Sequence, residues 1–421
     1  MKIGVIGLGD MGKMFAKIWA NNPSFEVYGC DKPENYQQLV DELADSRIEI
    51  LQDGIAISRI CDFILYSVEA ENIAKVVAQC GPSTKYGAIV AGQTSVKTPE
   101  IKAFQDYLPK DTQIVTCHAL YGPAVNPVGQ TLVLINHRAS NSAYQITKDI
   151  FSEIGSNIHE LEDYHAHDKM MADIQAVTHV GFESIGTACM HRKVYPWESA
   201  VHPSGLDNVK FLITLRIYSY KFHVYSGLAL QNPYAKKDVR KYAQIESELF
   251  EMMIMEDEKR FRKRIYAARD HVFKDHSEIL MLDDKIMNEY SLSQDKGHKP
   301  NSHLSLLAMV ETWHKLGTNP YKNLMCQTPP FRLRVGMAEY LFMNEDLLEE
   351  SIEAALFDKS IRGEDLAFHT AVHEWANIVE LGDKESYRQH FEATKTFLAN
   401  RLDEGRQKSS LLIEKLQKQA I

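Results

Sequence analysis

The pattern of hydrophobic and polar positions changes once along the chain. Over residues 1–160, short apolar runs bounded by turn residues alternate with segments of helix length. Strands alternating with helices at this spacing predict βαβ units, and therefore a Rossmann-type doubly wound parallel sheet covered by helices on both faces. The predicted strands are Lys2–Ile6, Glu26–Cys30, Phe63–Ser67, Ala88–Ala91, Gln113–Cys117 and Leu132–Asn136, and the predicted helices include Met11–Ala20, Asn35–Ala44, Glu71–Gln79 and Thr98–Tyr107.

The remainder of the chain carries long helical patterns without strand-like runs. Tyr164–Arg192 is predicted to form one long helix, and Leu402–Gln419 either a charged amphipathic helix or a frayed tail. Ser291–Pro300 is polar and contains Gly and Pro, which predicts a loop. Asn319–Pro320 and Pro329–Pro330 bracket a short connection, because each proline ends what precedes it.

These patterns predict two domains, a dinucleotide-binding Rossmann domain over residues 1–160 and an all-helical domain over residues 161–421. A chain of 421 residues is long enough for both. We expect the second domain to bind substrate. Because its long helices need burial on more than one side, we also expect it to form a homodimer. The chain begins directly with a predicted strand and has no apolar stretch of membrane-span length, so we expect an intracellular, cytoplasmic protein with no membrane partner.

Charge excludes one large class of partner. The chain has 47 basic and 57 acidic residues, a formal net charge of −10. An acidic surface repels phosphate polymers, so we expect no nucleic-acid partner. An anionic substrate would therefore need a local cationic site. The six cysteines are scattered without a C-x-x-C motif, which favours ordinary thiols over disulfides or cysteine–zinc sites.

A glycine-rich turn lies between the first predicted strand and helix. Its residues are Gly7, Leu8, Gly9, Asp10, Met11 and Gly12. This G-x-G-x-x-G pattern, in this context, predicts that a dinucleotide pyrophosphate binds at the helix N-terminus. Asp31 ends the next strand, nineteen residues after Gly12. A carboxylate there favours NAD, but the adjacent Lys32 could pair with the 2′-phosphate of NADP, so the residues leave both cofactors open.

Polar side chains follow the later strands of the predicted sheet. Ser67 and Val68 end one strand, Gln93 and Ser95 follow the next, and His118 ends the one after. In an open α/β sheet, ligands bind outside the carboxyl ends of the strands, so these residues should border the cofactor. A histidine there suits proton transfer beside a hydride acceptor, although a histidine satisfied within its loop is the alternative.

The helical half offers two further candidates. Asp168, Gln175 and His179 fall on one stripe of the predicted Tyr164–Arg192 helix, facing either solvent or a substrate cleft. Arg216 lies in the apolar run Val209–Ile217, where it needs a carboxylate or phosphate. That partner is either an internal acid or the carboxylate of a substrate.

The histidine pairs do not suffice for a metal site. His165 and His167 form an H-x-H pair, and His369 and His373 stand one helical turn apart. Zinc needs at least a third ligand, and no H-E-x-x-H motif is present. We therefore expect no metal.

Together these motifs resemble prephenate dehydrogenase, most closely its fungal, NADP-dependent form. The resemblance runs from the first residue to at least Phe342. It is carried by Gly7–Gly12, Gln93–Lys97, the His118 loop, His167-Asp168-Lys169 leading to His179, and Arg216, and by the stretches Cys80–Lys85, Ile135–Arg138, Gln175–His179, Leu215–Ser219, His223–Tyr225 and Asn301–Leu307.

The resemblance implies oxidative decarboxylation of prephenate to 4-hydroxyphenylpyruvate and CO₂, with hydride transfer to NADP, in tyrosine biosynthesis. It implies that His118 accepts the substrate hydroxyl proton and that Ser95 hydrogen-bonds to that hydroxyl or orients the imidazole. Arg216 would hold a substrate carboxylate, with His179 and Gln175 along the pocket wall. His118 and Arg216 would then reach opposite ends of one dicarboxylate.

The chain departs from bacterial relatives in two places. His118 is followed by Ala119 where they commonly have proline, and Ile217–His223 replaces an acid-rich segment, which leaves His223, Tyr225 and Asn232 as candidate contacts to the pyruvyl group. Two rival functions remain. One is a β-hydroxyacid dehydrogenase that uses Lys169, and the other is a non-catalytic dinucleotide sensor whose helical half binds partners.

Overall fold

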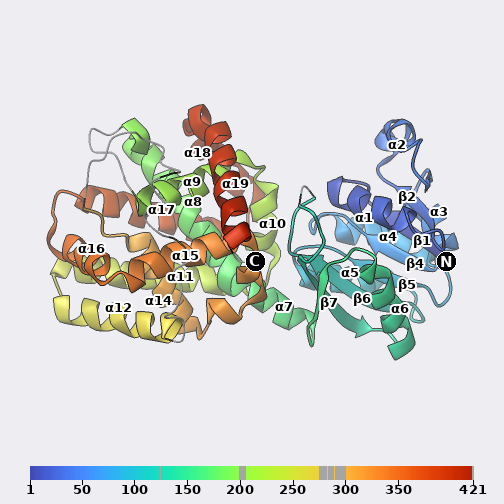
Figure 1. Ribbon diagram of the computed structural model, residues 1–421, viewed down its shortest axis with the longest axis horizontal. Helices are drawn as coiled ribbons and strands as arrows, with labels where there is room; N and C mark the ends of the chain where they lie inside the picture. Colours follow the sequence, from blue (N-terminus) through green and yellow to red (C-terminus); the bar gives the residue numbers. More distant parts are fainter. Residues whose placement is uncertain (124, 199–204, 275–281, 283–288, 290–299, 420–421) are drawn as a thin grey trace. The chain divides into compact units, whose positions relative to one another are not determined.

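The computed structural model describes the chain except residues 124, 199–204, 275–281, 283–288, 290–299 and 420–421 (Figure 1). The predicted loop Ser291–Pro300 lies outside the described residues, apart from Pro300. The chain forms two compact units, Met1–Lys169 and Met170–Ile421. No helix among the described residues is both long and apolar enough to cross a bilayer.

The first unit contains one eight-stranded sheet in the order β3-β2-β1-β4-β5-β6-β7-β8. β1 lies in the interior with β2 and β4 parallel on either side, the arrangement of a doubly wound fold. The predicted fold class is therefore confirmed. The strands are β1 (Lys2–Ile6), β2 (Glu26–Cys30), β3 (Ile48–Ile50), β4 (Phe63–Tyr66), β5 (Ile89–Gly92), β6 (Gln113–Ala119), β7 (Thr131–Arg138) and β8 (Asn157–Glu160).

Helices cover both faces of this sheet (Figure 1). One core contains Trp19, Leu39 and Phe151, and the other contains Val77 and Phe104. Burying both sheet faces explains why the strands are continuous apolar runs, and why periodicity located them. The helices are α1 (Asp10–Ala20), α2 (Tyr36–Glu42), α3 (Gly54–Ile60), α4 (Ile73–Cys80), α5 (Lys97–Tyr107), α6 (Asn141–Ser152) and α7 (Tyr164–Met171), which continues into the second unit.

The expectation of an all-parallel sheet is wrong at one pair of strands. β6 and β7 are antiparallel, with His118 opposite Val133. Only residues 120–130 connect them, and the described residues of that connection form no helix. A parallel crossover needs a dozen or more residues, usually including a helix, so the chain turns back instead. The short strands β3 and β8 were also missed, because three or four residues give little periodic signal.

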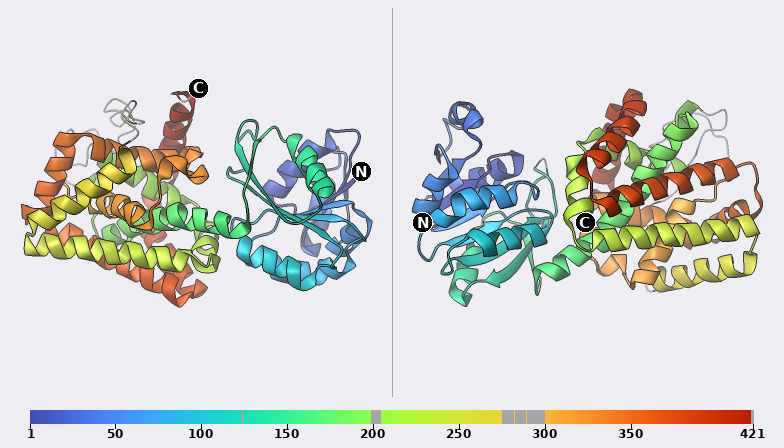
Figure 2. Two further views of the ribbon diagram at one scale, coloured as in Figure 1. Left: turned by 90° about the horizontal axis from the view of Figure 1, so that it is seen from below. Right: turned by 180° about the vertical axis from the view of Figure 1, so that it is seen from behind.

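The second unit is helical throughout its described part (Figure 2). α8 packs against α9, α14, α17 and α18, and α11 packs against α14 and α17. Its helices are α8 (Val177–Arg192), α9 (Leu206–Ser219), α10 (His223–Gln231), α11 (Ala235–Met255), α12 (Glu258–Phe273), α14 (Leu304–Leu316), α15 (Pro329–Met343), α16 (Glu345–Phe357), α17 (Arg362–Leu381), α18 (Lys384–Phe397) and α19 (Leu402–Gln419). The connection between α14 and α15 holds two 3₁₀ turns, Pro320–Lys322 and Leu324–Gln327.

The predicted helix Tyr164–Arg192 is continuous but not uniform. Between α7 and α8 the chain makes a π-helical segment, Ala172–Ala176. A π segment widens the turn and shifts the phase of the residues that follow, and such segments occur frequently at functional sites. The single stripe expected for Asp168, Gln175 and His179 assumed an uninterrupted α-helical period, which this segment breaks.

Candidate active site

The glycine turn has the geometry that close approach of a ligand requires. Gly7 has φ of +101°, and a Cβ there would lie 2.3 Å from the carbonyl oxygen of Ser67. A Cβ on Gly12 would lie 1.9 Å from the carbonyl oxygen of Gly7. A Cβ on Gly9 would meet nothing within 4 Å. Gly7 and Gly12 are thus required by the fold, whereas Gly9 leaves open space where a pyrophosphate would approach the backbone.

Both carboxylate oxygens of Asp31 accept hydrogen bonds from other groups of the protein. Its Oδ2 accepts the backbone N–H of Leu8 at 2.7 Å, and its Oδ1 accepts the backbone N–H of Lys32 and the amide of Asn35, each at 2.8 Å. The carboxylate therefore fixes the glycine turn to the end of β2. The neighbouring Lys32 is exposed. The exposed Lys32 therefore lies beside a carboxylate that is already hydrogen-bonded to protein groups.

A chain of three side chains leads away from the end of β6. Nδ1 of His118 lies 2.9 Å from Nε2 of His167, and Nδ1 of His167 lies 2.9 Å from Oδ1 of Asp168. His167 and Asp168 come from α7 and are fully buried. His118, His167 and Asp168 all belong to the first unit, so this arrangement is internal to it.

Donors around Asp168 keep it ionised. Oδ1 also accepts the backbone N–H of Lys97 at 2.7 Å, and Oδ2 accepts the N–H and the hydroxyl of Thr98 at 2.8 and 2.7 Å. These are the first residues of α5, so Asp168 caps that helix from a distance. Burial opposes ionisation, but hydrogen bonds from His167 and from the α5 N-terminus hold the pKa of Asp168 below its usual value.

The ionised Asp168 determines the tautomers of both histidines. It accepts Nδ1–H of His167, so Nε2 of the neutral His167 must accept Nδ1–H of His118. Nε2 of His118 is then left with its lone pair. Burial, together with His167 and Lys97, lowers the pKa of His118 well below its usual value, so this imidazole is neutral near pH 7. The arrangement makes His118 a proton acceptor rather than a donor.

A buried ion pair supports the same strand ends. Nζ of Lys97 lies 3.1 Å from Oε1 of Glu100 and donates to the carbonyl oxygen of Cys117 at 2.5 Å. The other carboxylate oxygen of Glu100 accepts the N–H of Thr94 at 2.8 Å. Both members of the pair are fully buried. Lys97 thereby ties the residue before His118 to the loop that carries Ser95.

Two sequence-predicted residues in that loop retain free hydrogen-bonding capacity. Oε1 of Gln93 is buried without a partner, and Ser95 makes no side-chain hydrogen bond with the described residues. Gln93 is held by its backbone N–H, which donates to Tyr66. Because buried polar atoms are nearly always satisfied, an orphaned amide oxygen at the carboxyl end of a strand points to a ligand.

In the second unit, the His179 ring lies among aromatic side chains. The His179 ring contacts Tyr225 edge-on, with centroids 4.8 Å apart, and lies 5.7 Å from the ring of Phe331. Neither Nδ1 of His179 nor Oε1 of Gln175 has a partner among the described residues. Burial and the cation of Arg334 lower the pKa of His179 well below its usual value, so His179 is neutral.

Arg334, on α15, is a residue that the sequence analysis missed. Its side chain is nearly fully buried, and Nε and Nη1 have no partner among the described residues. The guanidinium stacks over Phe331, 4.1 Å from the ring centroid. Glu183 interacts electrostatically with Arg334, but burial raises the pKa of Glu183 to about 8, so Glu183 offers little negative charge at neutral pH. A buried cation without an anion needs one from outside.

Arg216 contacts α19 and Tyr220, and its contact with a substrate carboxylate stays a prediction. Its Nη1 donates to the hydroxyls of Ser410 at 2.8 Å and Ser409 at 3.5 Å on α19, and its guanidinium lies 5.4 Å from the ring centroid of Tyr220. It forms no ion pair with a carboxylate in the described part of the chain, so the internal salt bridge is not found. Arg216 also lies close enough to Arg334 to lower the pKa of Arg334.

The signal for Arg334 was present in the sequence. Phe331-Arg-Leu-Arg-Val-Gly-Met337 places arginines in an apolar helix, the same pattern that singled out Arg216. The partner of His118 was harder to find, because the H-D dipeptide His167-Asp168 shows no periodicity. Of the remaining candidates, Tyr225 contacts the ring of His179.

Comparison with known proteins decides the family. Residues 2–161 match the NAD-binding domain of 6-phosphogluconate dehydrogenase, and residues 176–418 match a 6-phosphogluconate dehydrogenase C-terminal domain. The prephenate dehydrogenase (NADP+) of Saccharomyces cerevisiae is 44% identical over 96% of this chain and 91% of its own length. The chain belongs to the prephenate dehydrogenase family. A probable prephenate dehydrogenase (NADP+) of Schizosaccharomyces pombe is 42% identical over 99% of this chain and 97% of its own length.

A solved structure agrees on the fold. Prephenate dehydrogenase from Aquifex aeolicus, crystallised with hydroxyphenyl propionate and NAD+, superposes with a TM-score of 0.52 at 18% identity. It covers 62% of this chain and 94% of its own. The family predicted from the motifs is thus confirmed, and so is the order of a Rossmann-type unit followed by helices. NADP, rather than NAD, is the cofactor in the names of both fungal relatives.

Proposed function

We propose that the chain catalyses the NADP-dependent oxidative decarboxylation of prephenate to 4-hydroxyphenylpyruvate and CO₂. The observation that carries the proposal is the chain His118–His167–Asp168, which leaves a lone pair on Nε2 of His118 at the carboxyl end of β6. Family membership supplies the substrate, because the fungal relatives are named for prephenate.

In the proposed reaction, His118 accepts the proton of the prephenate ring hydroxyl. As the O–H bond breaks, the carbon bearing that oxygen loses a hydride and becomes a carbonyl carbon. The ring carboxylate then leaves as CO₂, its bonding electrons complete the aromatic ring, and the carbonyl oxygen, now a phenolate, takes up a proton to give the product hydroxyl. Ser95 hydrogen-bonds to the same hydroxyl, for which its uncommitted side chain is suited. His167 and Asp168 orient His118 and disperse the positive charge that it gains.

The dianionic substrate needs cations, and the second unit supplies two. Among the described residues, Nε and Nη1 of the buried Arg334 have no partner, and Arg216 donates to serine hydroxyls and lies over the ring of Tyr220. We assign a carboxylate of prephenate to Arg334 and keep Arg216 as the second cation of this region. His179 and Gln175 donate or accept hydrogen bonds along the same wall. A neutral Glu183 near Arg334 leaves the positive charge available to the substrate.

The residues around the glycine turn fit NADP. Bound there, NADP+ supplies the hydride acceptor. Gly7, Leu8, Gly9, Asp10, Met11 and Gly12 would hold the pyrophosphate, Lys32 the 2′-phosphate, and Ser67, Val68 and Gln93 the far half of the dinucleotide. Asp31 would act mainly by fixing the turn, since both of its oxygens already accept hydrogen bonds from protein groups.

Three further expectations stay predictions. They are the substrate-binding and dimerising role of residues 161–421, the homodimer itself and a cytoplasmic location. No nucleic-acid or membrane partner is proposed.

The decisive assay supplies purified protein with prephenate and either NADP+ or NAD+, and follows reduced cofactor and CO₂ together. We expect both to form in equal amounts, faster with NADP+. Turnover of 3-hydroxy acids without prephenate oxidation would support the β-hydroxyacid dehydrogenase instead. Cofactor binding without turnover of either substrate class would support the dinucleotide sensor.

A further inference from the structure

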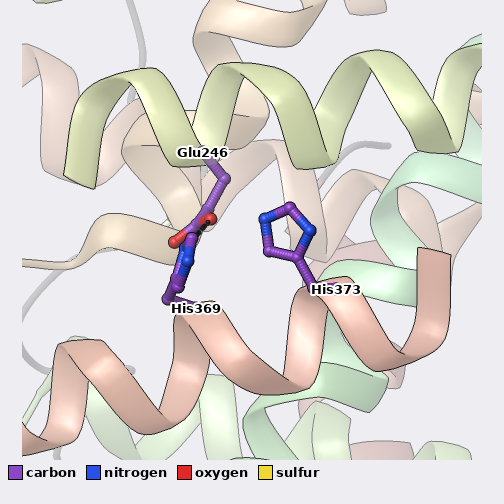
Figure 3. A group of neighbouring side chains, drawn as sticks. All are labelled: Glu246, His369 and His373. Carbon is purple, nitrogen blue, oxygen red and sulfur yellow. Dashed lines mark hydrogen bonds and ion pairs between the residues drawn. The ribbon is translucent and has the colours of Figure 1, made fainter. Parts of the chain in front are cut away.

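A histidine pair outside the proposed active site acquires a third neighbour in the folded chain. His369 and His373 lie one turn apart on α17, and the buried Glu246 of α11 lies opposite them (Figure 3). Each side chain offers one ligand atom, and these atoms lie within 4.8 Å of one another. The sequence lacked a third ligand for this pair, and the packing of α11 on α17 provides it.

One carboxylate oxygen of Glu246 has no partner among the described residues. Its Oε2 accepts from Nδ1 of His369 at 2.8 Å, whereas its Oε1 is buried without a partner. Because the residue is fully buried, that oxygen cannot be satisfied by bulk water. A cation placed among the three side chains would satisfy it.

The imidazoles are held in place but not locked. The His369 ring stacks on Phe250, with centroids 4.7 Å apart, and its side chain keeps 26% exposure. Nε2 of His373 lies 2.6 Å from Oγ of Ser247. The Ser247 hydroxyl also donates to the carbonyl oxygen of Ala243 at 2.9 Å. Ser247 therefore keeps a hydrogen bond if His373 moves away from it.

We propose that Glu246, His369 and His373 form a binding site for a divalent transition-metal ion of the Zn²⁺ class, joining α11 to α17. Two imidazoles and one carboxylate are a common ligand set for such ions, and a water completes the coordination. Bonds of about 2.0–2.2 Å put tetrahedral ligand atoms roughly 3.4 Å apart, so small side-chain rotations close the site.

The surroundings allow exchange with solvent. A surface hollow lined by Ser247, Phe250, Glu251, His369 and His373 opens beside the group. The ion would therefore enter from outside and keep one position for water. The site lies within the second unit and shares no residue with the proposed active site.

The test starts from full-length protein stripped with a chelator and then dialysed. Calorimetric titration with Zn²⁺ should show one ion bound per chain, and Co²⁺ should give the intense visible absorption of a four-coordinate site. His369→Gln, His373→Gln and Glu246→Gln should each weaken binding by more than the roughly 10–100-fold that loss of an outer-shell partner costs. The bound ion should also raise the thermal midpoint of the wild type but not of these variants.

The matched control is Glu374→Gln. Glu374 also lies on α17 and contacts two histidines, with Oε2 3.2 Å from Nε2 of His191 and 3.4 Å from Nε2 of His390. Its removal should leave the titration unchanged. Zn²⁺ binding that survives in His373→Gln, or that is lost in Glu374→Gln, would overturn the proposal. If Glu246→Gln fails to fold, the two partly exposed histidines still decide the question.

Discussion

Asp168 sets the protonation of His118 without touching it. The two are linked through His167, with nitrogen–nitrogen and nitrogen–oxygen distances of 2.9 Å each. Asp168 in turn is fixed by the first backbone N–H groups of α5. The start of a helix therefore determines which nitrogen of a histidine on a neighbouring strand can accept a proton.

Replacing His118 removes the proposed proton acceptor. We expect His118→Asn to lower kcat by roughly 10²–10⁴-fold, the usual contribution of a general acid–base group, while NADP+ affinity stays unchanged. Steady-state kinetics and cofactor titration measure the two effects. Wild-type turnover in this variant would refute the assignment.

The pH dependence follows from the direction of the His118 shift. His118 must be neutral to accept a proton, and burial with His167 and Lys97 keeps its pKa well below 6.5. Activity should therefore persist below pH 6.5 and fall only on further acidification. His167→Gln removes one of those causes, so the acidic limb of kcat/KM should move to higher pH. An acidic limb at the same pH as in the wild type would contradict the link from Asp168 through His167 to His118.

Replacing Arg334 should have opposite effects on substrate binding and on the stability of the folded protein. Arg334→Met should raise KM for prephenate by about 30-fold or more, because truncating one member of a buried charge pair costs about 2 kcal/mol or more. In the absence of substrate the same change should leave the free energy of unfolding unchanged or raise it, because an unpaired buried cation is lost. Kinetics and urea unfolding test both. Arg216→Met is the comparison, with a smaller effect on KM expected if Arg334 holds the carboxylate.

Glu183 should make the stability fall with rising pH. Burial raises the pKa of Glu183 in the folded state from its ordinary value of 4.5 to about 8. Between these values the unfolded chain loses a proton that the folded chain keeps, so stability is full below about pH 4.5 and declines as pH rises toward 8. Glu183→Gln should remove a contribution of a few kcal/mol to this decline. Melting curves at pH 5 and pH 8 compare the two proteins, and identical pH dependence would show that Glu183 is not the cause.

Cofactor preference should depend on Lys32. A charge-assisted hydrogen bond to phosphate contributes about 1.5–3 kcal/mol, so Lys32→Ala should raise KM for NADP+ roughly 10–100-fold and leave KM for NAD+ unchanged. Asp31→Asn is expected to impair both cofactors, because Asp31 holds the turn they share. Equal losses with both cofactors in Lys32→Ala would exclude a 2′-phosphate contact.

The sequence predicted the elements best where local signals were strong. β1 and β2 were predicted with their bounds, because apolar runs between turn residues leave little choice, and α19 was predicted equally well. The reversal between β6 and β7 depended on the length and content of a loop that carries no periodic signal. For the site, Ser95 and His118 could be found from their positions at strand ends. His167 as a partner of His118, and Glu246 as a neighbour of His369, arise only from tertiary packing.

The glycine turn separates two demands that are usually mixed. A methyl group at Gly12 would collide with a backbone carbonyl, so the fold itself requires glycine at this position. A methyl group at Gly9 would project into open space and obstruct nothing but an incoming nucleotide. Gly9→Ala should therefore yield a folded protein that does not bind its cofactor. This variant would show which other properties of the protein depend on bound cofactor.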